Sequence, residues 1–572
     1  MDYTIKVGGA AGQGLQTIGD ALAKVFARSG YHVFSHQDYE SRIRGGHNFY
    51  QIRLSDMPIM ASRERVDIIV ALDKETVSRH ANELSENGLV IYDPEALKEK
   101  HEGPGFLEIP FIKLATEDGG NRLMENTVAT GAVLGMMGIG TGTLSDIIRQ
   151  TFSKKGDDVI SANIRAAAAG QEYARQRCPH CRFDIAPTSA PKLLMSGVDA
   201  LALGCIASGV KFYSAYPMTP STGIMNYIAE RSAEFGIVVE QAEDEIAAIN
   251  MALGASFGGV RAMTGTSGGG FALMVEGLSL AAMTETPVVV ALGQRPGPAT
   301  GFPTRTEQGD LLFAIHAAHG EFPRVVLAPG TPEQAFYAAG KAFDLSEKYQ
   351  VPAIIIFDQY LADCQWTFGG LDAEKVVYHD YRLRGDDFRK VAQYRRHAFT
   401  ETGVSPLGVP GDAEHVVVTD SDEHDEEGHI VEDAETRLKM LDKRLFKKMP
   451  LVWHEISPPT LYGNTRPEVV LTGWGSSYGL MKEAVDVLSN KYRIAMLHFS
   501  ELYPFPDLES TGFLNLLDGA EATICIENNA TGQFARLVMA ETGYNFKHKI
   551  NRFNGRPFLL EELTGEIENV IG

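Results

Sequence analysis

The sequence has few cysteines, and only two of them are spaced as metal ligands often are. Among five cysteines, Cys178 and Cys181 form a C-x-x-C pair, and no second such pair exists. A zinc site or an iron–sulfur cluster takes about four ligands. A metal held by this pair is therefore the less favoured alternative to a loop with two thiols. An odd, sparse set in 572 residues is typical of reduced thiols, so we predict no disulfide framework and no metal site.

Basic residues and long apolar runs are also scarce. The chain has 52 basic and 74 acidic residues, a net charge of −22, whereas nucleic-acid binding needs a basic surface. The longest apolar runs, such as the one that begins at Pro287, have the length of a strand and cannot span a bilayer. The first residues also lack the pattern of a signal peptide. We expect a cytoplasmic protein that binds neither nucleic acid nor membrane.

Strand-like and helical segments alternate through most of the chain, which indicates the α/β class. The pattern predicts three doubly wound α/β domains, over residues 1–190, 193–400 and 450–572. Residues 401–449 differ, since they carry prolines, glycines and nine carboxylates between Asp420 and Glu435. We predict a solvated acidic connection there, ending in a basic amphipathic helix over 436–448. His424 and His429 lie among the carboxylates, but a metal is less favoured than a solvated loop.

Three glycine-rich segments follow predicted strands and precede predicted helices, at residues 8–14, 265–270 and 473–477. Such turns leave backbone N–H groups free at a helix N-terminus, where an anion is favoured. The first segment is neither a Walker A loop nor a strict dinucleotide-binding fingerprint. Each alone is more often a tight turn than a ligand site, but three in one chain favour phosphate binding by at least one.

Two further segments place polar residues near predicted strand ends. In residues 216–222 (YPMTPST), two prolines keep the backbone out of a helix and present Thr219 beyond a strand. The alternative is a helix start capped by Ser221 or Thr222, and both can hold together because the cap does not use Thr219. Glu243, Asp244 and Glu245 then open a helix of small apolar residues. Acidic residues there complement the helix dipole, and one of them is expected to be desolvated.

The segment 293–310 is rich in Gly, Pro and Thr and carries Arg295 and Arg305. It follows a buried strand, so it lies where open α/β sheets bind ligands. Arginine suits bidentate binding of a carboxylate. An arginine here is either an anion anchor or a member of a surface ion pair.

Taken in order, these motifs resemble the alpha subunit of 2-oxoacid:ferredoxin oxidoreductases, in particular the 2-oxoglutarate branch. The resemblance is carried by YPMTPST, EQAEDEIAAINMALGAS, TGTSGGGFALM, QRPGPATGFPTRTEQGD and DEHDEEGHIVEDAE. The first domain resembles the gamma subunit of that family, through GGAAGQGLQT and YESRIRGGHNFYQIRLSD. The last resembles a transketolase C-terminal-like domain, through ELYPFP and ENNATGQFARLV. The middle domain then corresponds to the pyrimidine-binding domain for thiamine diphosphate.

The resemblance implies conversion of a 2-oxoacid and coenzyme A to acyl-CoA and carbon dioxide, with two electrons passed to ferredoxin. It implies a glutamate that hydrogen-bonds the aminopyrimidine ring of thiamine diphosphate. Glu245 fits this role because Gly254 follows nine residues later, and Glu243 is the fallback. By similarity, Thr219 binds the substrate and Arg305 pairs with its carboxylate, with Arg295 as the competing choice.

The resemblance also assigns residues that bind cofactors. It places Pro217 and Met218 at thiamine diphosphate. A weaker, fold-level analogy has four residues of the first domain help enclose coenzyme A. These are Gly12, Gly14, Arg42 and His47.

Two features of the family are missing from the chain. It has no Gly-Asp-Gly segment for the diphosphate and Mg²⁺, and no four-cysteine set for a 4Fe-4S cluster. The resemblance therefore implies a beta subunit that carries both, an (αβ)₂ heterotetramer, and ferredoxin as the electron acceptor. The same chemistry on pyruvate, a branched-chain or an aryl 2-oxoacid stays open, as does a non-catalytic scaffold that binds CoA or a nucleotide.

Overall fold

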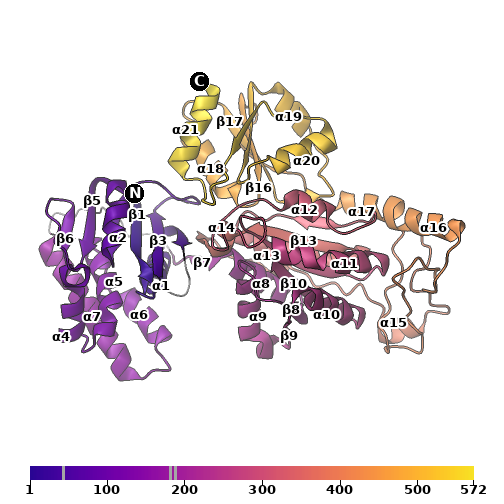
Figure 1. Ribbon diagram of the computed structural model, residues 1–572, viewed down its shortest axis with the longest axis horizontal. Helices are drawn as coiled ribbons and strands as arrows, with labels where there is room; N and C mark the ends of the chain where they lie inside the picture. The colour runs from indigo at the N-terminus through magenta and orange to yellow at the C-terminus, as the bar shows by residue number, and fades with distance from the viewer. Residues whose placement is uncertain (41–44, 179–182, 184, 186–189) are drawn as a thin grey trace. The chain divides into compact units, whose positions relative to one another are not determined.

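The computed structural model describes residues 1–40, 45–178, 183, 185 and 190–572. The chain divides into two compact units. The first comprises Met1–Met195, Asp363–Gly370 and Phe558–Leu563, and the second comprises the rest. The described strands form sheets of eight, seven and five strands, with helices packed on them (Figure 1). The predicted α/β class is confirmed, whereas the predicted domain boundaries stay a prediction.

The first sheet is mixed, with the strand order β6-β5-β4-β1-β3-β2-β14-β7. Strands β1, β4, β5 and β6 run parallel, and β3 pairs antiparallel with both β1 and β2. The strand bounds are β1 Asp2–Ala11, β2 His32–Tyr39, β3 Gly45–Ser55, β4 Val66–Ala71, β5 Leu84–Tyr92, β6 Phe106–Glu108, β7 Leu193–Ser196 and β14 Gln365–Phe368. Only residues 40–44 separate β2 from β3 in the sequence, too few for the crossover that a parallel pair would need.

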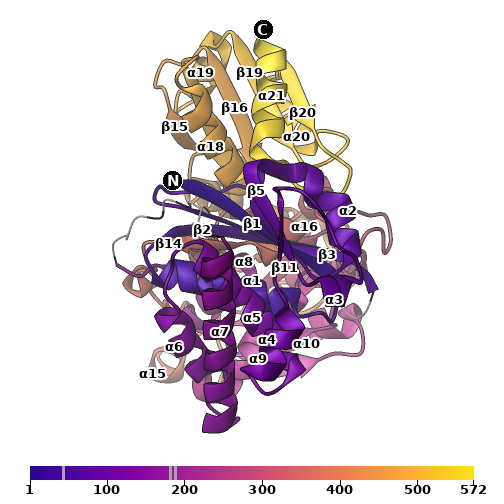
Figure 2. The same ribbon diagram turned by 90° about the vertical axis from the view of Figure 1, so that its left-hand side faces the viewer.

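Helices α1, α5 and α7 cover one face of this sheet (Figure 2). Their close packing depends on glycine, since a Cβ at Gly131 of α5 would overlap the carbonyl oxygen of Ala167 on α7. The helices of this unit are α1 Leu15–Arg28, α2 Lys74–His80, α3 Pro94–Leu97, α4 Phe111–Glu117, α5 Glu125–Met136, α6 Gly142–Thr151 and α7 Asp157–Arg177. Helices α2 and α3 pack on the opposite face.

The second sheet has the order β18-β12-β13-β11-β10-β8-β9, and its strands are parallel except for β18 at the edge. Strands β11 (Val288–Gln294) and β13 (Pro352–Asp358) are buried throughout, as central parallel strands should be. The other strands are β8 Phe212–Ala215, β9 Val238–Gln241, β10 Ala262–Ser267, β12 Val325–Leu327 and β18 Glu501–Tyr503. The helices are α8 Gly197–Ala207, α9 Thr222–Phe235, α10 Glu245–Phe257, α11 Gly268–Met283, α12 Leu311–His316, α13 Pro332–Tyr349 and α14 Gln359–Asp363.

The third sheet has the order β15-β17-β16-β19-β20 and is parallel except for β15. One apolar core runs from α10, α11 and α12 into this sheet and α20. Together with β18, which pairs with β12, this core ties the second and third sheets into one unit. The elements are β15 Thr460–Gly463, β16 Val469–Trp474, β17 Ile494–Phe499, β19 Ala522–Glu527, β20 His548–Asn551, α18 Ser477–Leu488, α19 Phe513–Gly519, α20 Gln533–Thr542 and α21 Leu560–Ile571.

The acidic connection is anchored at a buried carboxylate, Glu285, which follows α11. Lys443 and Lys448 both donate to the Glu285 carboxylate, and the His397 ring lies 3.2 Å from it. The three cationic or imidazole side chains are at most 1% exposed. Burial of this segment therefore exceeds what a solvated loop would show. A continuous helical run carries the lysines: α16 Ala434–Leu441, the π-helical η4 Asp442–Lys447 and α17 Lys448–His454.

Within the described part of the chain, no helix combines the length and the apolar character that crossing a membrane requires.

Candidate functional site

The second sheet has a topological switch point between β8 and β10. The chain leaves β8 toward β9 on one side and returns to β10 on the other. In open α/β sheets, ligands bind beyond the carboxyl ends of the strands at such a point. The segment 216–222 follows β8, and the glycine segment 265–270 leads from β10 into α11. Both predicted motifs therefore lie at one crevice.

The three acidic residues at the start of α10 have three different environments. Asp244 is the helix cap, because its carboxylate accepts a hydrogen bond of 2.7 Å from the backbone N–H of Ala247. Glu243 is exposed. Glu245 begins the helix and is only 4% exposed. Asp244 already complements the helix dipole as the cap, so the burial of Glu245 needs another explanation.

Glu245 lies against the start of α11. A Cβ at Gly270 would overlap both Glu245 Oε1 and the hydroxyl of Thr266, so glycine makes room for the carboxylate. That hydroxyl lies 4.0 Å from Met218 Sδ, which brings the segment after β8 to the same place. Among the described residues, Glu245 Oε1 has no hydrogen-bond partner. A buried polar atom without a partner is costly, and the ring N–H of a bound cofactor would satisfy it.

Thr219 is held at this crevice through its backbone. Arg295 Nη1, just beyond β11, donates a hydrogen bond of 3.0 Å to the carbonyl oxygen of Thr219. Pro220 packs against Gly293, where a Cβ would overlap the proline ring. The Ser221 hydroxyl donates to the carbonyl oxygen of Met218 at 2.8 Å, so it does not cap α9 by its side chain.

Charges near the crevice are poorly solvated. Burial raises the pKa of Asp310 to about 6, and Arg295 opposes this shift. Burial also lowers the pKa of Arg295. A Cβ at Gly268 would overlap the Asp310 carboxylate, so this carboxyl group lies at the N-terminus of α11. Arg295, predicted as the competing anchor, therefore has a structural role, because it bonds the Thr219 carbonyl oxygen and interacts with the charge of Asp310.

Arg305 lies ten residues further along the same loop and is 9% exposed. Its Cβ lies beside Gly555, and the next residue, Thr306, donates its backbone N–H to the carbonyl oxygen of Gly555 at 3.4 Å. The Thr306 hydroxyl accepts the backbone N–H of Tyr360 at 3.2 Å. The loop that carries Arg305 is therefore fixed on two sides.

Gln308 anchors this loop in the third sheet. Its side-chain amide donates to the carbonyl oxygen of Trp474 at 3.0 Å and accepts the backbone N–H of Asn528 at 2.9 Å. Asn529 Nδ2 donates to the carbonyl oxygen of Gln308 at 3.1 Å. These contacts lie between the carboxyl ends of β16 and β19, the switch point of the third sheet. The third glycine segment, 473–477, therefore binds the protein's own loop.

Gly12 and Gly14 line a cavity of about 540 Å³ in the first unit, which also includes Asn48 and Asp38. Both glycines have positive φ, at 94° and 82°, and Gly14 caps α1, whose first turn carries no acidic residue. This helix N-terminus favours an anion. His47 neighbours Asn48 on β3, so its side chain lies on the other face of the sheet. Arg42, predicted with them, lies outside the described residues.

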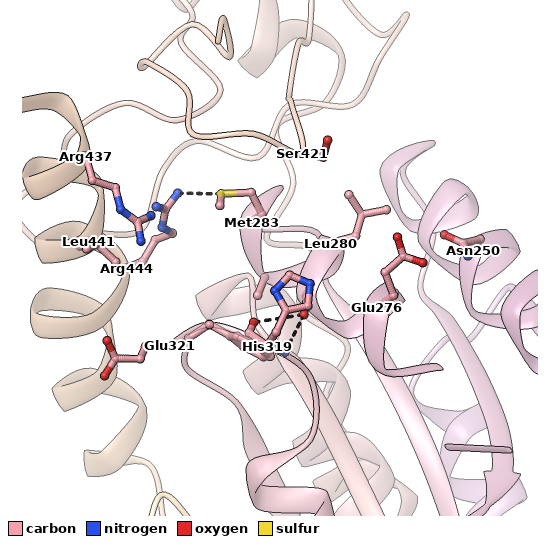
Figure 3. Close-up of a pocket in the computed structure, with 15 residues that line it drawn as sticks. Asn250, Glu276, Leu280, Met283, His319, Glu321, Ser421, Arg437, Leu441 and Arg444 are labelled. Atoms are coloured by element: carbon pink, nitrogen blue, oxygen red, sulfur yellow. Dashed lines mark hydrogen bonds between the residues drawn. The ribbon is translucent and has the colours of Figure 1, made fainter. Parts of the chain in front are cut away.

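A larger cavity, of about 620 Å³, lies at the other end of α11 (Figure 3). It is lined by Glu276 and Met283 of α11, by His319 and by Arg437 and Arg444. From Gly270 to Met283 the helix rises roughly 20 Å, at about 1.5 Å per residue. Its lining also includes Asn250 of α10, and none of the predicted site residues lines it.

The acidic loop and the cysteine pair, both considered as metal ligands, differ in outcome. Asp425, Glu427 and His429 come close enough to share an ion, but Asp425 already accepts the backbone N–H groups of the other two in a turn. His424 turns inward and is fully buried. Cys178 is disulfide-bonded, so the prediction of reduced thiols is wrong for this residue. Cys181 lies outside the described residues.

Sequence reasoning missed Asp310 and Gln308. Both lie in the segment 293–310 that was singled out for its arginines. Their partners are distant in sequence, so no local spacing reveals them. For Asp310 the sequence offers one signal, which is a polar residue placed between Gly309 and an apolar segment that begins at Leu311.

Comparisons with known proteins match the whole chain. A family model described as "Pyruvate flavodoxin/ferredoxin oxidoreductase, thiamine diP-bdg" matches residues 203–443. A second, "Pyruvate ferredoxin/flavodoxin oxidoreductase", matches residues 4–173. The chain is 33% identical to the 2-oxoacid:ferredoxin oxidoreductase subunit alpha of Saccharolobus solfataricus, over 100% of this chain and 98% of that protein.

Two further similarities concern 2-oxoglutarate enzymes. The chain is 29% identical to the 2-oxoglutarate oxidoreductase subunit KorA of Mycobacterium tuberculosis, over 88% of this chain and 82% of that protein. Its fold matches a solved structure with a TM-score of 0.91 and 31% identity, over 100% of both chains. That structure is the 2-oxoglutarate:ferredoxin oxidoreductase from Magnetococcus marinus with 2-oxoglutarate, coenzyme A and succinyl-CoA bound.

Proposed function

The chain belongs to the 2-oxoacid:ferredoxin oxidoreductase alpha subunits, and we propose that with a second subunit it interconverts 2-oxoglutarate and succinyl-CoA. The forward reaction consumes 2-oxoglutarate and coenzyme A, releases carbon dioxide and passes two electrons to ferredoxin. The similarity to 2-oxoglutarate enzymes supports this substrate. The observation that carries the proposal is the buried Glu245 carboxylate at the switch point of the second sheet, one oxygen of which has no hydrogen-bond partner among the described residues.

Thiamine diphosphate fits this position. Glu245 Oε1 would accept a hydrogen bond from the aminopyrimidine ring, and Gly270 leaves space beside it. Met218 and Pro217 would line the same pocket. When bound, the cofactor supplies a nucleophilic carbon for the keto group and a store for the electrons left by decarboxylation. Glu245 holds the ring in the protonation state that this chemistry needs.

The substrate carboxylate needs a fixed cation, since a desolvated carboxylate without a partner costs several kcal/mol. We assign this role to Arg305, with the Thr219 hydroxyl as a neutral hydrogen-bond donor. Arg305 is nearly buried and its loop is anchored at Thr306 and Gln308. Arg295 remains the alternative anchor, although its contact with the Thr219 carbonyl already gives it a positional role.

The second subunit would cover the open side of the crevice. Near Glu245, several large apolar side chains are exposed by more than a third: Tyr216, Ile246, Met251 and Leu273. A Cβ at Gly254 of α10 would meet no atom within 4 Å, so this helix can be approached closely from outside. The chain lacks a Gly-Asp-Gly segment, which supports a beta subunit that holds the diphosphate, Mg²⁺ and a 4Fe-4S cluster.

We further propose that the first unit helps to enclose coenzyme A. The N-terminus of α1 and the cavity at Gly12 and Gly14 provide a site for its phosphates. Asp38 also lines that cavity, and its charge would disfavour an anion, so a cation must complete the site. Of the two residues predicted from the sequence, Arg42 is the candidate, because the His47 side chain lies on the other face of the sheet. An (αβ)₂ assembly and a cytoplasmic location stay predictions.

Two alternatives stay open. A related enzyme acting on pyruvate, a branched-chain or an aryl 2-oxoacid would use the same residues around Glu245. A non-catalytic scaffold that binds CoA or a nucleotide would not explain why a Glu245 oxygen is buried without a hydrogen-bond partner among the described residues.

The test is co-expression of this chain with the second subunit, followed by purification of the complex. We expect bound thiamine diphosphate, iron in the complex but none in this chain alone, and CoA-dependent reduction of a low-potential acceptor. Among 2-oxoacids, 2-oxoglutarate should give the highest kcat/KM. Preference for another 2-oxoacid would select the first alternative, and a complex that neither binds the cofactor nor turns over would select the scaffold.

A further inference from the structure

The cavity of about 620 Å³ beside α11 lies within the second unit, between two helical faces (Figure 3). Each face contributes three residues that follow one another at intervals of four and three, so they lie on one side of their helix. These residues are Glu276, Leu280 and Met283 on α11, and Arg437, Leu441 and Arg444 on α16 and η4. A volume of this size is typical of sites for small organic molecules.

The guanidinium group of Arg444 is buried and incompletely bonded. The residue is 5% exposed, and its Nη2 donates to both carboxylate oxygens of Glu423 at 2.8 Å. Among the described residues, Nη1 has a single acceptor, the thioether sulfur of Met283 at 3.4 Å (Figure 3). A thioether is a weak acceptor. The oxygen of an anion in the cavity would accept a much stronger hydrogen bond from this nitrogen.

Positive charge exceeds negative charge around Arg444. The Glu423 carboxylate is shared by Arg444 and Arg437. The Glu285 carboxylate is shared by two buried lysines, and its backbone carbonyl accepts a buried arginine. The cations of this cluster are Arg396, Arg437, Lys443, Arg444 and Lys448. Within the described part of the chain, two carboxylates pair with these five cations, so a further anion beside Arg444 would reduce the imbalance.

The pKa values of the two lysines reflect this imbalance. Burial lowers the pKa of Lys443 to about 8, and the charges of Lys448 and Arg396 add to the shift, although Glu285 opposes it. Burial also lowers the pKa of Lys448, and Arg396 and Arg444 contribute. The charge at the wall of the cavity therefore acts on the buried cluster behind it.

The other end of the cavity favours a different chemical group. Glu276 and Asn250 lie there, away from the two arginines, and Leu280 lies between the two ends (Figure 3). Glu276 precedes Met283 by seven residues, which is about 10 Å along the helix. The Glu276 carboxylate is exposed, and it attracts a hydrogen-bond donor and repels a second anion.

We propose that this cavity binds a small carboxylic acid with an apolar chain and a hydrogen-bond donor, such as an amino group, at its far end. The carboxylate accepts from Arg444, the chain lies along Leu280, and the donor reaches Glu276. A singly charged head group suits the arginine end better than a doubly charged one, because Glu423 and the exposed Glu321 also lie there. This site is additional to the proposed reaction and does not depend on it.

The experiment measures binding to the full-length chain by isothermal titration calorimetry. The probe is 8-aminooctanoate, whose carboxylate and amino groups are separated by an apolar chain of suitable length. Octanedioate is the comparison, because it carries a second carboxylate in place of the amino group. We expect one molecule of 8-aminooctanoate per chain and about fivefold weaker binding of octanedioate, since ion pairs with an exposed carboxylate are weak. Glu276→Gln should remove this difference.

Two variants test the cavity itself. Arg444→Met keeps the length of the side chain but removes its charge, and it should weaken binding of 8-aminooctanoate by about tenfold or more, because a charge-assisted hydrogen bond is lost. Leu280→Trp should weaken binding as much by filling the cavity, and it leaves every charge in place. Leu461→Trp is the matched control, because Leu461 lines another cavity of the second unit, of about 540 Å³, where no described basic side chain contributes to the lining. It should leave the affinity unchanged.

Binding at Arg305 is the competing explanation, since that arginine is proposed to pair with a substrate carboxylate. Arg305→Ala should therefore keep the wild-type affinity for 8-aminooctanoate, and a loss of binding there would overturn the proposal. Absence of saturable binding to the wild-type chain, or wild-type affinity in Leu280→Trp, would overturn it as well. If circular dichroism shows that Arg444→Met or Leu280→Trp is unfolded, the other variant decides. A two-subunit complex without turnover would refute the proposed function and leave this site unaffected.

Discussion

Replacing Gln308 by alanine should loosen the loop that carries Arg305 without touching the substrate. The Gln308 side chain is 1% exposed and makes two hydrogen bonds, to the carbonyl oxygen of Trp474 and from the N–H of Asn528. Alanine leaves both backbone groups buried without a partner. Each such group costs about 1–3 kcal/mol, so we expect a loss of about 3 kcal/mol from the closed state of the loop.

This loss appears in catalysis as a lower fraction of molecules with the loop in place. The apparent affinity for the 2-oxoacid falls in proportion to that fraction, and 3 kcal/mol sets an upper limit of about 100-fold. We expect KM for 2-oxoglutarate to rise about tenfold, with bound thiamine diphosphate unchanged. Gln171→Ala is the control, because that side chain donates to the Ile139 carbonyl at 2.6 Å in the first unit. An unchanged KM in Gln308→Ala, or an equal rise in Gln171→Ala, would refute the reasoning.

Three further predictions concern the crevice directly. Glu245→Gln should keep cofactor binding but lose more than 100-fold in kcat, measured with saturating cofactor. A normal kcat in Glu245→Gln, together with a reduced kcat in Glu243→Gln, would assign the contact with the aminopyrimidine ring to Glu243. For 2-oxoglutarate, kcat/KM should fall most in Arg305→Ala, less in Arg305→Lys, which keeps the charge but not the planar fork, and least in Thr219→Ala, where a neutral hydrogen bond is worth about 0.5–1.5 kcal/mol. Wild-type kcat/KM in Arg305→Ala would contradict the assignment. Burial raises the pKa of Asp358 from 3.8 to about 6. The folded chain therefore binds more protons than the unfolded chain between these values, and the free energy of unfolding falls by about 2–3 kcal/mol as the pH rises through them. Asp358→Asn should reduce the fall measured by urea unfolding across that interval by this amount, and leave the part that comes from Asp310, whose pKa burial also raises to about 6. A fall of undiminished size would assign it to other groups.

Local patterns predicted the second sheet well. The sequence predicted that Glu243, Asp244 and Glu245 open a helix of small apolar residues, and the structure has α10 at Glu245–Phe257. This prediction follows from apolar spacing and a capping residue, which are properties of neighbouring residues. The crevice could be predicted for the same reason, because parallel strands place their following loops at one edge.

The acidic connection could not be predicted in this way. Lys443 and Lys448 were expected on a solvated basic helix, yet both are buried at Glu285, about 160 residues earlier in the chain. They are five residues apart, and the π-helical segment between them brings residues at that spacing onto one side. Nothing in the local sequence indicates a π-helical turn, and a partner so distant leaves no periodic signal.

The first sheet shows a related limit. Its strands were predicted, but the antiparallel pairing of β3 with β1 and β2 was not. A strand pattern states which residues are buried and not which neighbour they pair with. The contact between His47 and His80, whose Nε2 atoms lie 2.7 Å apart, depends on that pairing, since it joins β3 to α2.

The occupied switch point of the third sheet has a consequence for how the protein can vary. A Gln308 side chain fills the position where a free sheet of this kind would bind a small molecule. The domain of the third sheet therefore holds the loop that carries Arg305 in place. It does so at all times, because the loop and the domain belong to the same chain. A substitution in residues 528–533, remote from the crevice in sequence, could alter which 2-oxoacid is accepted by changing how this internal ligand is seated. Selectivity in this chain can accordingly be tuned from a domain that carries none of the predicted site residues.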